Sequence, residues 1–198
     1  MPQADKKQTT CPKGLVSLGS NATSTARESA KIIHDAVDFI AQSNLRITKI
    51  SEFYKTPCFP PGAGPDFVNA AIEVQTDLLP HDLLQFLHET EVRFGRERPS
   101  RWAPRTLDMD LIACGDVVLP DRALLQHWMD MPLEDQKKLA PEQLILPHPR
   151  VQDRAFVLIP LADIAPDWRH PIIGKTVREL VAALPDAEKK GVQPYVAS

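Results

Sequence analysis

The sequence predicts an α+β sandwich whose elements follow the order β-α-β-β-α-β over residues 14–114. Two patterns support this order. Four separate stretches have strand composition or alternating polarity, and two stretches between them carry apolar residues at helical spacing. This is the element order of the ferredoxin-like fold, in which helices pack on an antiparallel sheet.

The first half of this order consists of two strands and one helix. Residues 14–19 form a short apolar run that ends in Gly-Ser-Asn, which indicates a strand followed by a turn. Thr25 and Glu28 have the spacing of a capping box, and a long helix with one apolar face follows them. Residues 45–54 are rich in β-branched and aromatic side chains and predict the second strand.

The second half consists of two strands around one helix. Residues 66–76 predict a strand, because every second side chain in its centre is apolar. Pro80 opens the helix, and Gly95 stands where a left-handed C-terminal cap is expected. Residues 106–113 predict the last strand. The proline- and glycine-rich stretch at 56–65 is expected to be a long loop.

Extra C-terminal elements are expected after this unit. They are a helical insertion at 121–143, a rigid turn at Pro147-His148-Pro149, and helices at 155–164 and 176–184. We expect a single domain at 13–186, between a mobile N-terminal tail at 1–12 and a C-terminal tail at 187–198.

Composition and charge narrow the classes of function. The chain has 198 residues and is 43% hydrophobic, which suffices for a continuous core. A net charge of -3 disfavours a protein that coats nucleic acid. No stretch approaches the roughly 18 apolar residues of a membrane span, and no apolar segment follows the basic pair near the N-terminus. We therefore expect a cytoplasmic protein with no nucleic-acid, membrane or obligatory protein partner.

The three cysteines, Cys11, Cys58 and Cys114, are odd in number and far apart. This spacing fits neither a disulfide framework nor a zinc site. Reduced thiols are therefore expected, as in other cytoplasmic proteins.

Asp108 and Asp110 form the most informative short segment. At strand period both carboxylates lie on one face, and the apolar Leu107, Met109 and Leu111 lie on the other. Alternate strand residues are about 6.5 to 7 Å apart, so the two carboxylates can jointly hold a hard cation such as Mg²⁺. The alternative is a pair of acids on a solvated sheet edge, because the pattern is short and common.

Five arginines precede this strand within thirteen residues: Arg93, Arg96, Arg98, Arg101 and Arg105. Arginine forks bind phosphate oxygens in bidentate fashion, while Mg²⁺ neutralises phosphate charge. Together with the two acids, the cluster favours phosphoryl chemistry on a nucleoside triphosphate. Taken alone, the cluster is equally explained by surface arginines that balance neighbouring glutamates.

Two further groups of residues suit a flat ligand. Phe67 and Asn69 share the strand face opposite the apolar set, and a ring beside an amide fits a heterocycle, although a loop could equally cover this face. Residues 147–156 bring together His148, three arginine or aromatic side chains and two prolines. A lone histidine is more often structural than functional.

Several segments also occur in the order typical of one enzyme family: Leu18-Gly19-Ser20-Asn21, Phe53-Tyr54-Lys55-Thr56-Pro57, Asp66-Phe67-Val68-Asn69-Ala70-Ala71, Arg101-Trp102-Ala103-Pro104-Arg105-Thr106-Leu107-Asp108-Met109-Asp110, Pro147-His148-Pro149 and Arg154-Ala155-Phe156. From Gly14 to Pro171 the chain resembles the 6-hydroxymethyl-7,8-dihydropterin pyrophosphokinases of folate biosynthesis. The resemblance implies transfer of diphosphate from ATP to the hydroxymethyl group of the pterin, with AMP as the second product.

The resemblance also implies roles for individual residues. Asp108 and Asp110 would hold two Mg²⁺ ions that bridge the ATP phosphates. The ATP site would include Glu91, Arg96, Arg98, Trp102, Arg105, Leu111, His148 and Arg154, with Arg96 and Arg105 catalytic beside the two acids. The pterin would stack between Phe67 and Phe156 and bind Asn69 at its edge, with Thr56, Pro57 and Phe59 completing the pocket.

The chain departs from the usual family pattern in four places. Phe67 stands where tyrosine is common, and Pro149 stands where another aromatic or polar residue is common. The arginine loop is one residue shorter than usual. The segment at 121–143 replaces a shorter link before the Pro-His segment.

Two other functions are compatible with some of these residues. A nucleotidyltransferase also binds two metals on a D-x-D strand, but it would release pyrophosphate instead of AMP. An RNA-binding module shares the element order, although the chain has a net charge of -3 and no K/R-G-F/Y-G/A-F-V-x-F/Y segment. For a pyrophosphokinase, we expect the loops at 56–65 and 95–104 to close over the substrates.

Overall fold

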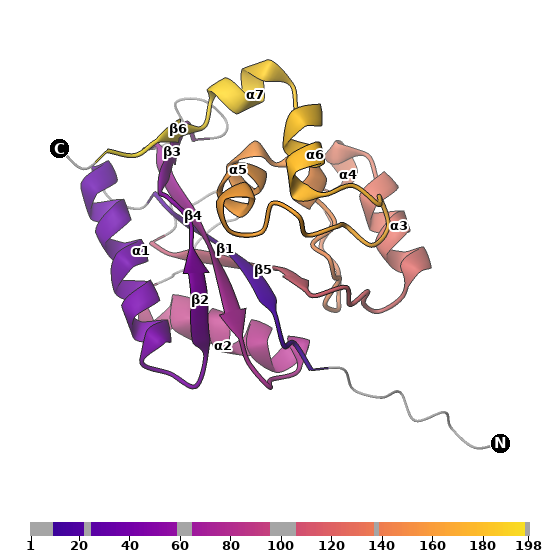
Figure 1. The fold of residues 1–198 in the computed structure, drawn as a ribbon, viewed down its shortest axis with the longest axis horizontal. Helices are drawn as coiled ribbons and strands as arrows, with labels where there is room; N and C mark the ends of the chain where they lie inside the picture. Colours follow the sequence, from indigo (N-terminus) through magenta and orange to yellow (C-terminus); the bar gives the residue numbers. More distant parts are fainter. Residues whose placement is uncertain (1–9, 22–24, 59–64, 96–105, 137–138, 197–198) are drawn as a thin grey trace.

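The computed structural model describes residues 10–21, 25–58, 65–95, 106–136 and 139–196. Six strands in this part form one sheet with the order β5-β1-β4-β3-β6, and β2 also pairs with β4 (Figure 1). All pairings are antiparallel. The strands are β1 (Gly14–Ser20), β2 (Arg46–Ile50), β3 (Tyr54–Thr56), β4 (Phe67–Gln75), β5 (Asp108–Cys114) and β6 (Gln193–Pro194).

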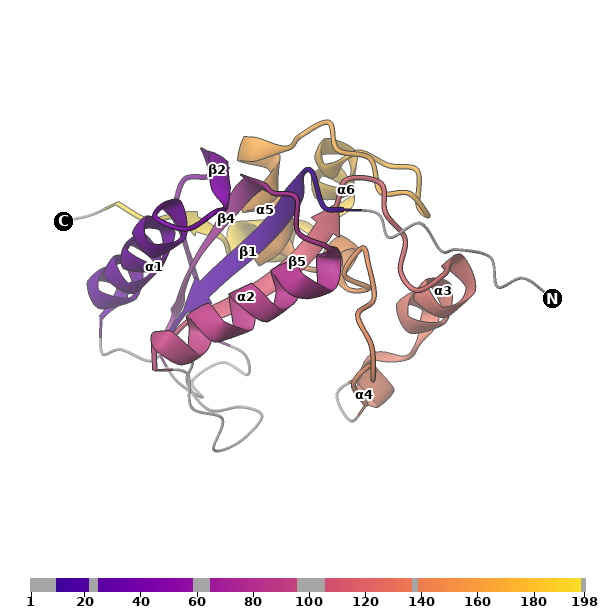
Figure 2. The same cartoon turned by 90° about the horizontal axis from the view of Figure 1, so that it is seen from below.

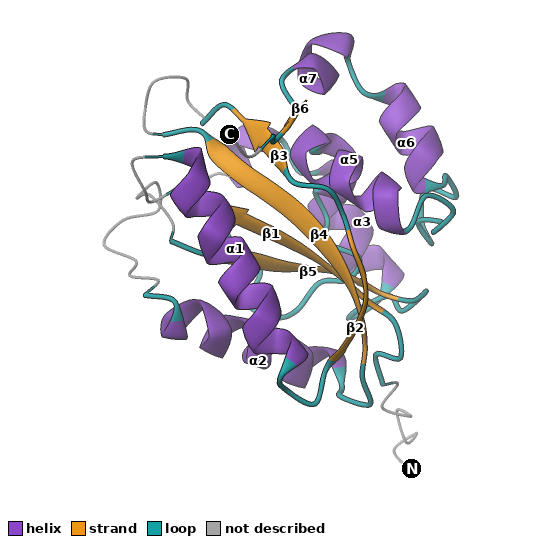
Figure 3. Ribbon diagram, turned by 60° about the vertical axis from the view of Figure 1, so that its left-hand side comes forward, coloured by secondary structure: helices purple, strands orange, loops and turns teal. Residues whose placement is uncertain are grey.

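Helices cover both faces of this sheet. Helices α1 (Ala26–Ala41) and α2 (Pro80–Arg93) lie along one face, and α5 (Ala155–Ile164) lies on the other (Figures 2 and 3). Helix α6 (Val177–Ala183) packs on α5. The α+β sandwich expected from the sequence is confirmed. Among the described residues, no helix has the length and apolar character that crossing a bilayer requires.

Strand β4 shows why the chain forms two apolar cores. Its alternate side chains from Val68 to Val74 join the core under α1 and α2, as the period of the sequence predicted. Ala71 points to the opposite face and joins the core under α5, together with Leu15 and Ala113. Residues on both faces of the central strands are therefore buried.

The helix signals at the first helix are also confirmed. Thr25 is the N-cap of α1, and its side chain accepts a hydrogen bond from the backbone of Glu28 at 3.2 Å. The same device opens α6, where Thr176 and Glu179 form a reciprocal capping box.

The single strand expected at 45–54 is wrong, because the structure divides it into β2 and β3. Ile50 pairs with Ile72 and Tyr54 pairs with Asn69, so four steps along this segment face three steps along β4. The extra residue lies between Ser51 and Tyr54, because the backbone N–H of Ser51 still donates to Ala71 O at 2.9 Å. The Ser51 hydroxyl accepts a hydrogen bond from the backbone N–H of Ala71 at 2.8 Å, in place of a backbone carbonyl.

The helical insertion expected at 121–143 contains α3 (Arg122–Asp130) and the short α4 (Leu133–Gln136). Asp121 caps α3 by accepting a hydrogen bond from Leu124 N at 2.9 Å. An isolated bridge between Leu119 and Leu146 closes the base of the excursion. A hollow of about 370 Å³ lies between α3 and residues 139–145, and none of the expected site residues lines it.

The C-terminal segment adds to the sheet. Residues 187–196, expected as a tail, contain most of α7 (Asp186–Lys190) and all of β6, which pairs with β3. Tyr195 N also donates to Phe53 O at 2.7 Å. The C-terminal part of the chain is thus joined to the sheet through β3 and the residue that precedes it.

The expectation of reduced thiols is wrong for two of the three cysteines. Cys11 and Cys114 form a disulfide across a sequence separation of 103 residues. The cause is the antiparallel register of β1 and β5, which pairs Gly14 with Cys114 and brings the preceding residues beside it. Wide spacing in sequence therefore did not mean wide spacing in the fold. Cys58 is buried and takes no part in this disulfide.

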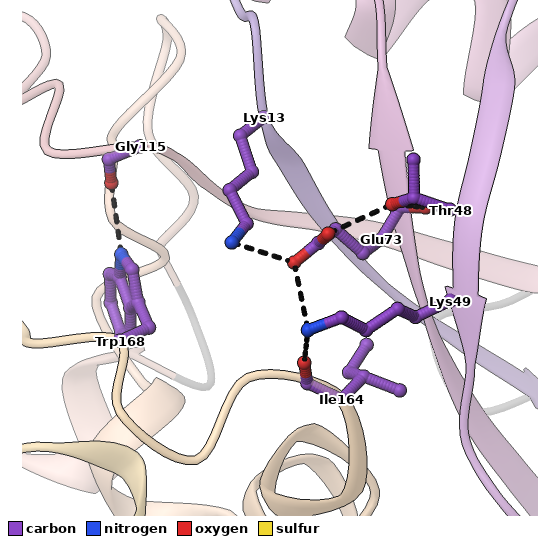
Figure 4. Close-up of polar contacts among 7 residues, drawn as sticks. All are labelled: Lys13, Thr48, Lys49, Glu73, Gly115, Ile164 and Trp168. Atoms are coloured by element: carbon purple, nitrogen blue, oxygen red, sulfur yellow. Dashed lines mark hydrogen bonds and ion pairs between the residues drawn. The ribbon is translucent and has the colours of Figure 1, made fainter.

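A buried carboxylate joins the far end of α5 to the sheet (Figure 4). Glu73 accepts a hydrogen bond from Thr48 Oγ1 at 2.8 Å and forms an ion pair with Lys13 Nζ at 2.9 Å. Burial opposes its ionisation, but the hydrogen bonds from Lys13 and Thr48 and the charge of Lys49 outweigh burial and lower the pKa of Glu73. Lys49 Nζ also donates to Ile164 O, the last carbonyl of α5, at 2.6 Å.

The loop after α5 is organised around a fully buried histidine. His170 Nδ1 accepts hydrogen bonds from the backbone N–H groups of Ile172 at 3.2 Å and Ile173 at 3.3 Å. Burial lowers the pKa of His170 to about 4, so the ring is neutral at physiological pH. Nearby, Trp168 Nε1 donates to Gly115 O at 2.9 Å and ties this loop to the end of β5 (Figure 4).

We predict that His170 makes the fold sensitive to acid. Between pH 6.5 and about 4 the unfolded chain binds a proton that the folded chain does not, so stability falls as the pH drops through this window. The slope from one such group is at most about 1.4 kcal/mol per pH unit. In His170→Asn, which keeps an acceptor but does not titrate, urea unfolding should show a weaker dependence on pH across the window. An unchanged slope would contradict the assignment, and His81→Asn on exposed α2 surface is the control.

Candidate active site

Strand β5 presents Asp108 and Asp110 on the sheet face that also carries α5. Both are half-buried, whereas Met109 is 1% exposed and packs under α1 and α2. The alternation expected from the strand period is therefore present. Asp110 keeps 37% of its side chain exposed, which leaves carboxylate oxygens accessible to a ligand.

The neighbouring strands extend this face across the sheet. Gly19 on β1 pairs with Asp108 on one side and with Asn69 of β4 on the other. Directly paired residues of an antiparallel sheet project to the same face. The acids and Asn69 therefore flank a position that has no side chain.

Gly19 lies between these residues, and the sequence had not been used to assign it a role in the candidate site. A Cβ atom at this position would lie 3.0 Å from Asn69 Oδ1 and 3.8 Å from Phe67 Cδ1. The signal was available in the sequence, because a glycine inside a strand often marks a close approach of a ligand or another chain segment.

Asn69 is held in one orientation by a hydrogen bond. It is 3% exposed, and its Nδ2 donates to Thr56 Oγ1 of β3 at 2.8 Å. Phe67 pairs with Thr56 in the same register, so its ring lies on the same face as the amide. Three residues expected in the pterin pocket are thus adjacent across β3 and β4.

The N-terminal end of α5 closes the site from above the sheet. Arg154 precedes the helix, and its Nη1 lies 3.5 Å from Asp110 Oδ2. Its guanidinium carbon lies 5.7 Å from the centre of the Phe156 ring. Phe156 is 37% exposed although it is a large apolar residue, which is what a stacking surface requires.

His148 is fixed beside β5 by its backbone. Its N–H donates to Ile112 O at 2.8 Å, and its Nδ1 accepts from Arg150 N at 3.1 Å. Burial and the charges of Arg154 and Arg150 lower the pKa of His148 to about 3, against an opposing effect of Asp108. The neutral ring therefore carries its proton on Nε2, which can donate a hydrogen bond.

Two residues of the expected nucleotide site have buried side chains. Leu111 is 3% exposed and lies in the core under α1 and α2, so only its backbone can reach a ligand. Glu91 is 1% exposed, and its Oε1 accepts a hydrogen bond from Met109 N at 2.7 Å. Five expected site residues, Phe59, Arg96, Arg98, Trp102 and Arg105, lie outside the described residues.

The acid pair suits a cation that keeps water and phosphate ligands. Among the described residues, no group of three or more His, Cys, Asp or Glu side chains could hold a metal ion. Mg²⁺ does not need such a group, because it commonly binds through one or two carboxylates together with substrate phosphates and water. Asp108 and Asp110 therefore fit Mg²⁺ better than a cation that needs a full protein ligand set.

Comparison with known proteins agrees with this geometry. Residues 15–166 match the family model of 7,8-dihydro-6-hydroxymethylpterin-pyrophosphokinase (HPPK). The chain belongs to this family. The HPPK match begins in β1 and ends just after α5, so it includes all the described site residues.

Individual HPPK relatives match over most of the chain. A Pseudomonas aeruginosa 2-amino-4-hydroxy-6-hydroxymethyldihydropteridine pyrophosphokinase is 38% identical over 170 residues, covering 86% of this chain and 90% of the relative. The enzyme of that name from Synechocystis sp. is 34% identical over 175 residues, covering 86% of this chain and 75% of the relative.

A solved structure supports the fold. The crystal structure of wild-type Plasmodium falciparum HPPK-DHPS matches with a TM-score of 0.62 and 14% identity. The match covers 90% of this chain and 42% of that chain, so this chain spans less than half of the solved protein. At this identity the likeness concerns the fold, which agrees with the sandwich described above.

A hydrogen-bonded contact joins β3 to α5, the two elements on either side of the candidate site. Asp163 Oδ2, near the end of α5, accepts from Tyr54 Oη at 2.9 Å and from Glu52 N at 3.2 Å. Burial and the hydrogen bond to Asp163 raise the pKa of Tyr54 to about 12. Since β3 carries Thr56 and α5 carries Phe156, this contact helps to set the distance between β3 and α5.

Replacement of Asp163 by alanine should therefore lower the free energy of unfolding by about 1 kcal/mol, the typical net value of a hydrogen bond. It should also lower the pKa of Tyr54 toward its ordinary value, as measured by ultraviolet titration in a Tyr195→Phe background. Asp167→Ala is the control, because Asp167 is 79% exposed in its ion pair with Arg178. A Tyr54 titration that is the same with and without Asp163 would contradict the contact.

Proposed function

We propose that this chain transfers diphosphate from ATP to the hydroxymethyl group of 6-hydroxymethyl-7,8-dihydropterin, giving AMP and the pterin diphosphate in folate biosynthesis. Membership of the HPPK family supports the reaction. The observation that carries it in the structure is the pair Asp108 and Asp110, on one face with Asn69 and with Asp110 3.5 Å from Arg154 at the start of α5. That arrangement supports a phosphate site next to a site for a flat heterocycle.

For the nucleotide, we propose two Mg²⁺ ions held by Asp108 and Asp110. When bound, the ions would neutralise phosphate charge and polarise the oxygens of the transferred group. Arg154 lies beside Asp110 and can bind phosphate oxygens from the same side. His148 offers an N–H donor at the same edge of β5, and Arg96, Arg98 and Arg105 are proposed to complete the phosphate contacts.

For the pterin, we propose stacking between Phe67 on the sheet and Phe156 on α5. The amide of Asn69 would bind the polar edge of the ring, because Thr56 already fixes its orientation. The missing side chain at Gly19 leaves room between this edge and the acids. The hydroxymethyl group can then approach the diphosphate held at β5.

The chemical step requires positioning more than proton transfer. The hydroxymethyl oxygen forms a bond to the β-phosphorus, and the bond from that phosphorus to the oxygen shared with the α-phosphate breaks, so that oxygen leaves with AMP. The hydroxyl proton is released once the new bond forms. A loose phosphoryl-transfer transition state needs little early proton removal, so no dedicated general base is required.

Product analysis distinguishes this function from nucleotidyl transfer. Incubation with Mg²⁺, ATP and the reduced hydroxymethylpterin should yield AMP and the pterin diphosphate. Release of pyrophosphate with a nucleotidylated product would replace the proposal by its rival.

Within that assay, Asp110→Asn should lower kcat at least about 10²-fold, because the amide cannot supply the negative charge that holds the cations. Asp116→Asn is the matched control, since Asp116 is exposed just beyond the end of β5. Near-normal turnover of Asp110→Asn at saturating Mg²⁺ would remove the acid from the site.

Gly19→Ala should selectively weaken pterin binding. The new methyl group would lie 3.0 Å from Asn69 Oδ1, so the amide must move from the orientation that Thr56 imposes. We expect the KM for pterin to rise roughly tenfold, equivalent to about 1.4 kcal/mol, with little change in the KM for ATP.

A double-mutant cycle with Asn69→Ala provides the control for this crowding. Once the amide is absent, the added methyl group has no oxygen to displace, so the two effects should not add. Additive effects on the pterin KM would show that Gly19 acts by another route.

A further inference from the structure

Strand β5 has an outer edge, because it pairs only with β1 in the described sheet. Backbone groups on such an edge need partners from outside the sheet or from water. Two partners are present along β5. His148 N donates to Ile112 O at 2.8 Å, and Glu91 Oε1 accepts from Met109 N at 2.7 Å. The second contact lies between Asp108 and Asp110 in the sequence.

The burial of Glu91 needs a specific explanation. Glu91 is 1% exposed in the last turns of α2, whereas the next residue, Val92, is 70% exposed. Burial of apolar surface alone would favour the reverse arrangement, since a buried carboxylate loses free energy unless it is hydrogen-bonded or paired. A valine or leucine at position 91 would pack without that loss, but it could not accept the N–H of Met109.

The contact also determines how the two acids are aimed. In an antiparallel pair, N–H and C=O groups of successive residues alternate between the partner strand and the outer edge. The backbone N–H of Met109 points outward and donates to Glu91. By this alternation, the N–H groups of Asp108 and Asp110, on either side of Met109, point toward β1. A rotation of β5 about its axis at Met109 would turn both carboxylates away from the site, and the hydrogen bond to α2 resists that rotation.

We propose that Glu91 is a positioning residue for the acid pair, which acts through the backbone of Met109 and holds both carboxylates at the spacing that a divalent cation requires. This inference rests on the proposed function for the role of Asp108 and Asp110. It differs from the nucleotide contact that the family resemblance implied, because it assigns the Glu91 carboxylate to the backbone N–H of Met109.

Two substitutions separate the hydrogen bond from the charge. Glu91→Gln keeps an acceptor oxygen at the same place but removes the charge, and Glu91→Leu removes both. Glu89→Leu is the matched control, because Glu89 lies two residues earlier in α2 and is exposed. If Glu91 acts by positioning, Glu91→Gln should retain the protection of the Met109 amide and the cation affinity that Glu91→Leu loses.

The first measurement is amide hydrogen exchange of Met109 in the protein without nucleotide. In the wild type, Glu89→Leu and Glu91→Gln this amide should be protected, and in Glu91→Leu it should exchange at least about tenfold faster. The second measurement is the affinity for Mn²⁺ in the presence of a non-hydrolysable ATP analogue, determined by electron paramagnetic resonance. Loss of a group that orients metal ligands typically lowers affinity about 10- to 100-fold, and we expect this for Glu91→Leu only.

The third measurement is the steady-state rate. Glu91→Leu should raise the Mg²⁺ concentration needed for half-maximal rate, with a KM for pterin within about threefold of the wild type, because Asn69 and Phe67 lie on another strand. Wild-type Mn²⁺ affinity in a folded Glu91→Leu overturns the inference. Equal impairment of the glutamine and leucine variants also overturns it, since charge would then be the cause.

Glu91→Gln and the wild-type protein distinguish the remaining outcomes. If Glu91→Leu does not fold, Glu91→Gln carries the test: protection of the Met109 amide with near wild-type Mn²⁺ affinity supports the inference, and loss of either overturns it. A wild-type protein that binds no divalent cation with the ATP analogue contradicts the proposed function, whereas wild-type binding that is unaffected in Glu91→Leu contradicts only the role of Glu91.

Discussion

The site depends on the register of β1 with its two neighbours. Gly19 is paired with Asp108 on one side and with Asn69 on the other, so one residue of β1 sets the relation between the acids and the amide. A slip of one residue in either pairing would turn a whole strand over, because side chains alternate between faces. The apolar residues of β1 and β4 prevent such a slip, since it would move buried side chains such as Val16 and Ile72 out of the core under α1 and α2.

The face opposite that core is divided between packing and chemistry along a single strand. On β4 the successive side chains of this face are Phe67, Asn69, Ala71 and Glu73. Ala71 lies under α5, and its small side chain lets the helix approach the sheet. Toward the C-terminal end of β4, Glu73 lies beyond the helix and forms ion pairs with lysines. Toward the N-terminal end of β4, Asn69 and Phe67 lie on the side of the candidate site. The position of α5 along β4 therefore decides which residues the helix covers, and the contacts of Lys49 and Asp163 hold the C-terminal end of the helix in that position.

Much of this could be predicted from local periodicity, and the parts that could not depend on contacts between distant segments. The period of residues 66–76 and the acids of β5 gave the faces of both strands correctly, because alternation is a property of the strand itself. The break between Ser51 and Tyr54, the disulfide between Cys11 and Cys114, and the pairing of β6 with β3 each require knowledge of which strands are neighbours. For the same reason Glu91 could be placed near the site by resemblance, but its bond to Met109 could not be read from spacing.

The contact between Arg154 and Asp110 explains how two charged side chains can be paired in the absence of a ligand and still be available to bind one. Their atoms lie 3.5 Å apart, and their side chains are 29% and 37% exposed. An ion pair that is so open to solvent is worth at most about 1 kcal/mol. Phosphate oxygens, which bind the guanidinium through paired hydrogen bonds, and a cation, which binds the carboxylate, can each replace one partner at small cost. The weak pair thus keeps both groups at the edge of the site, whereas the buried contacts of Asn69 and Glu91 keep the strands behind them in place.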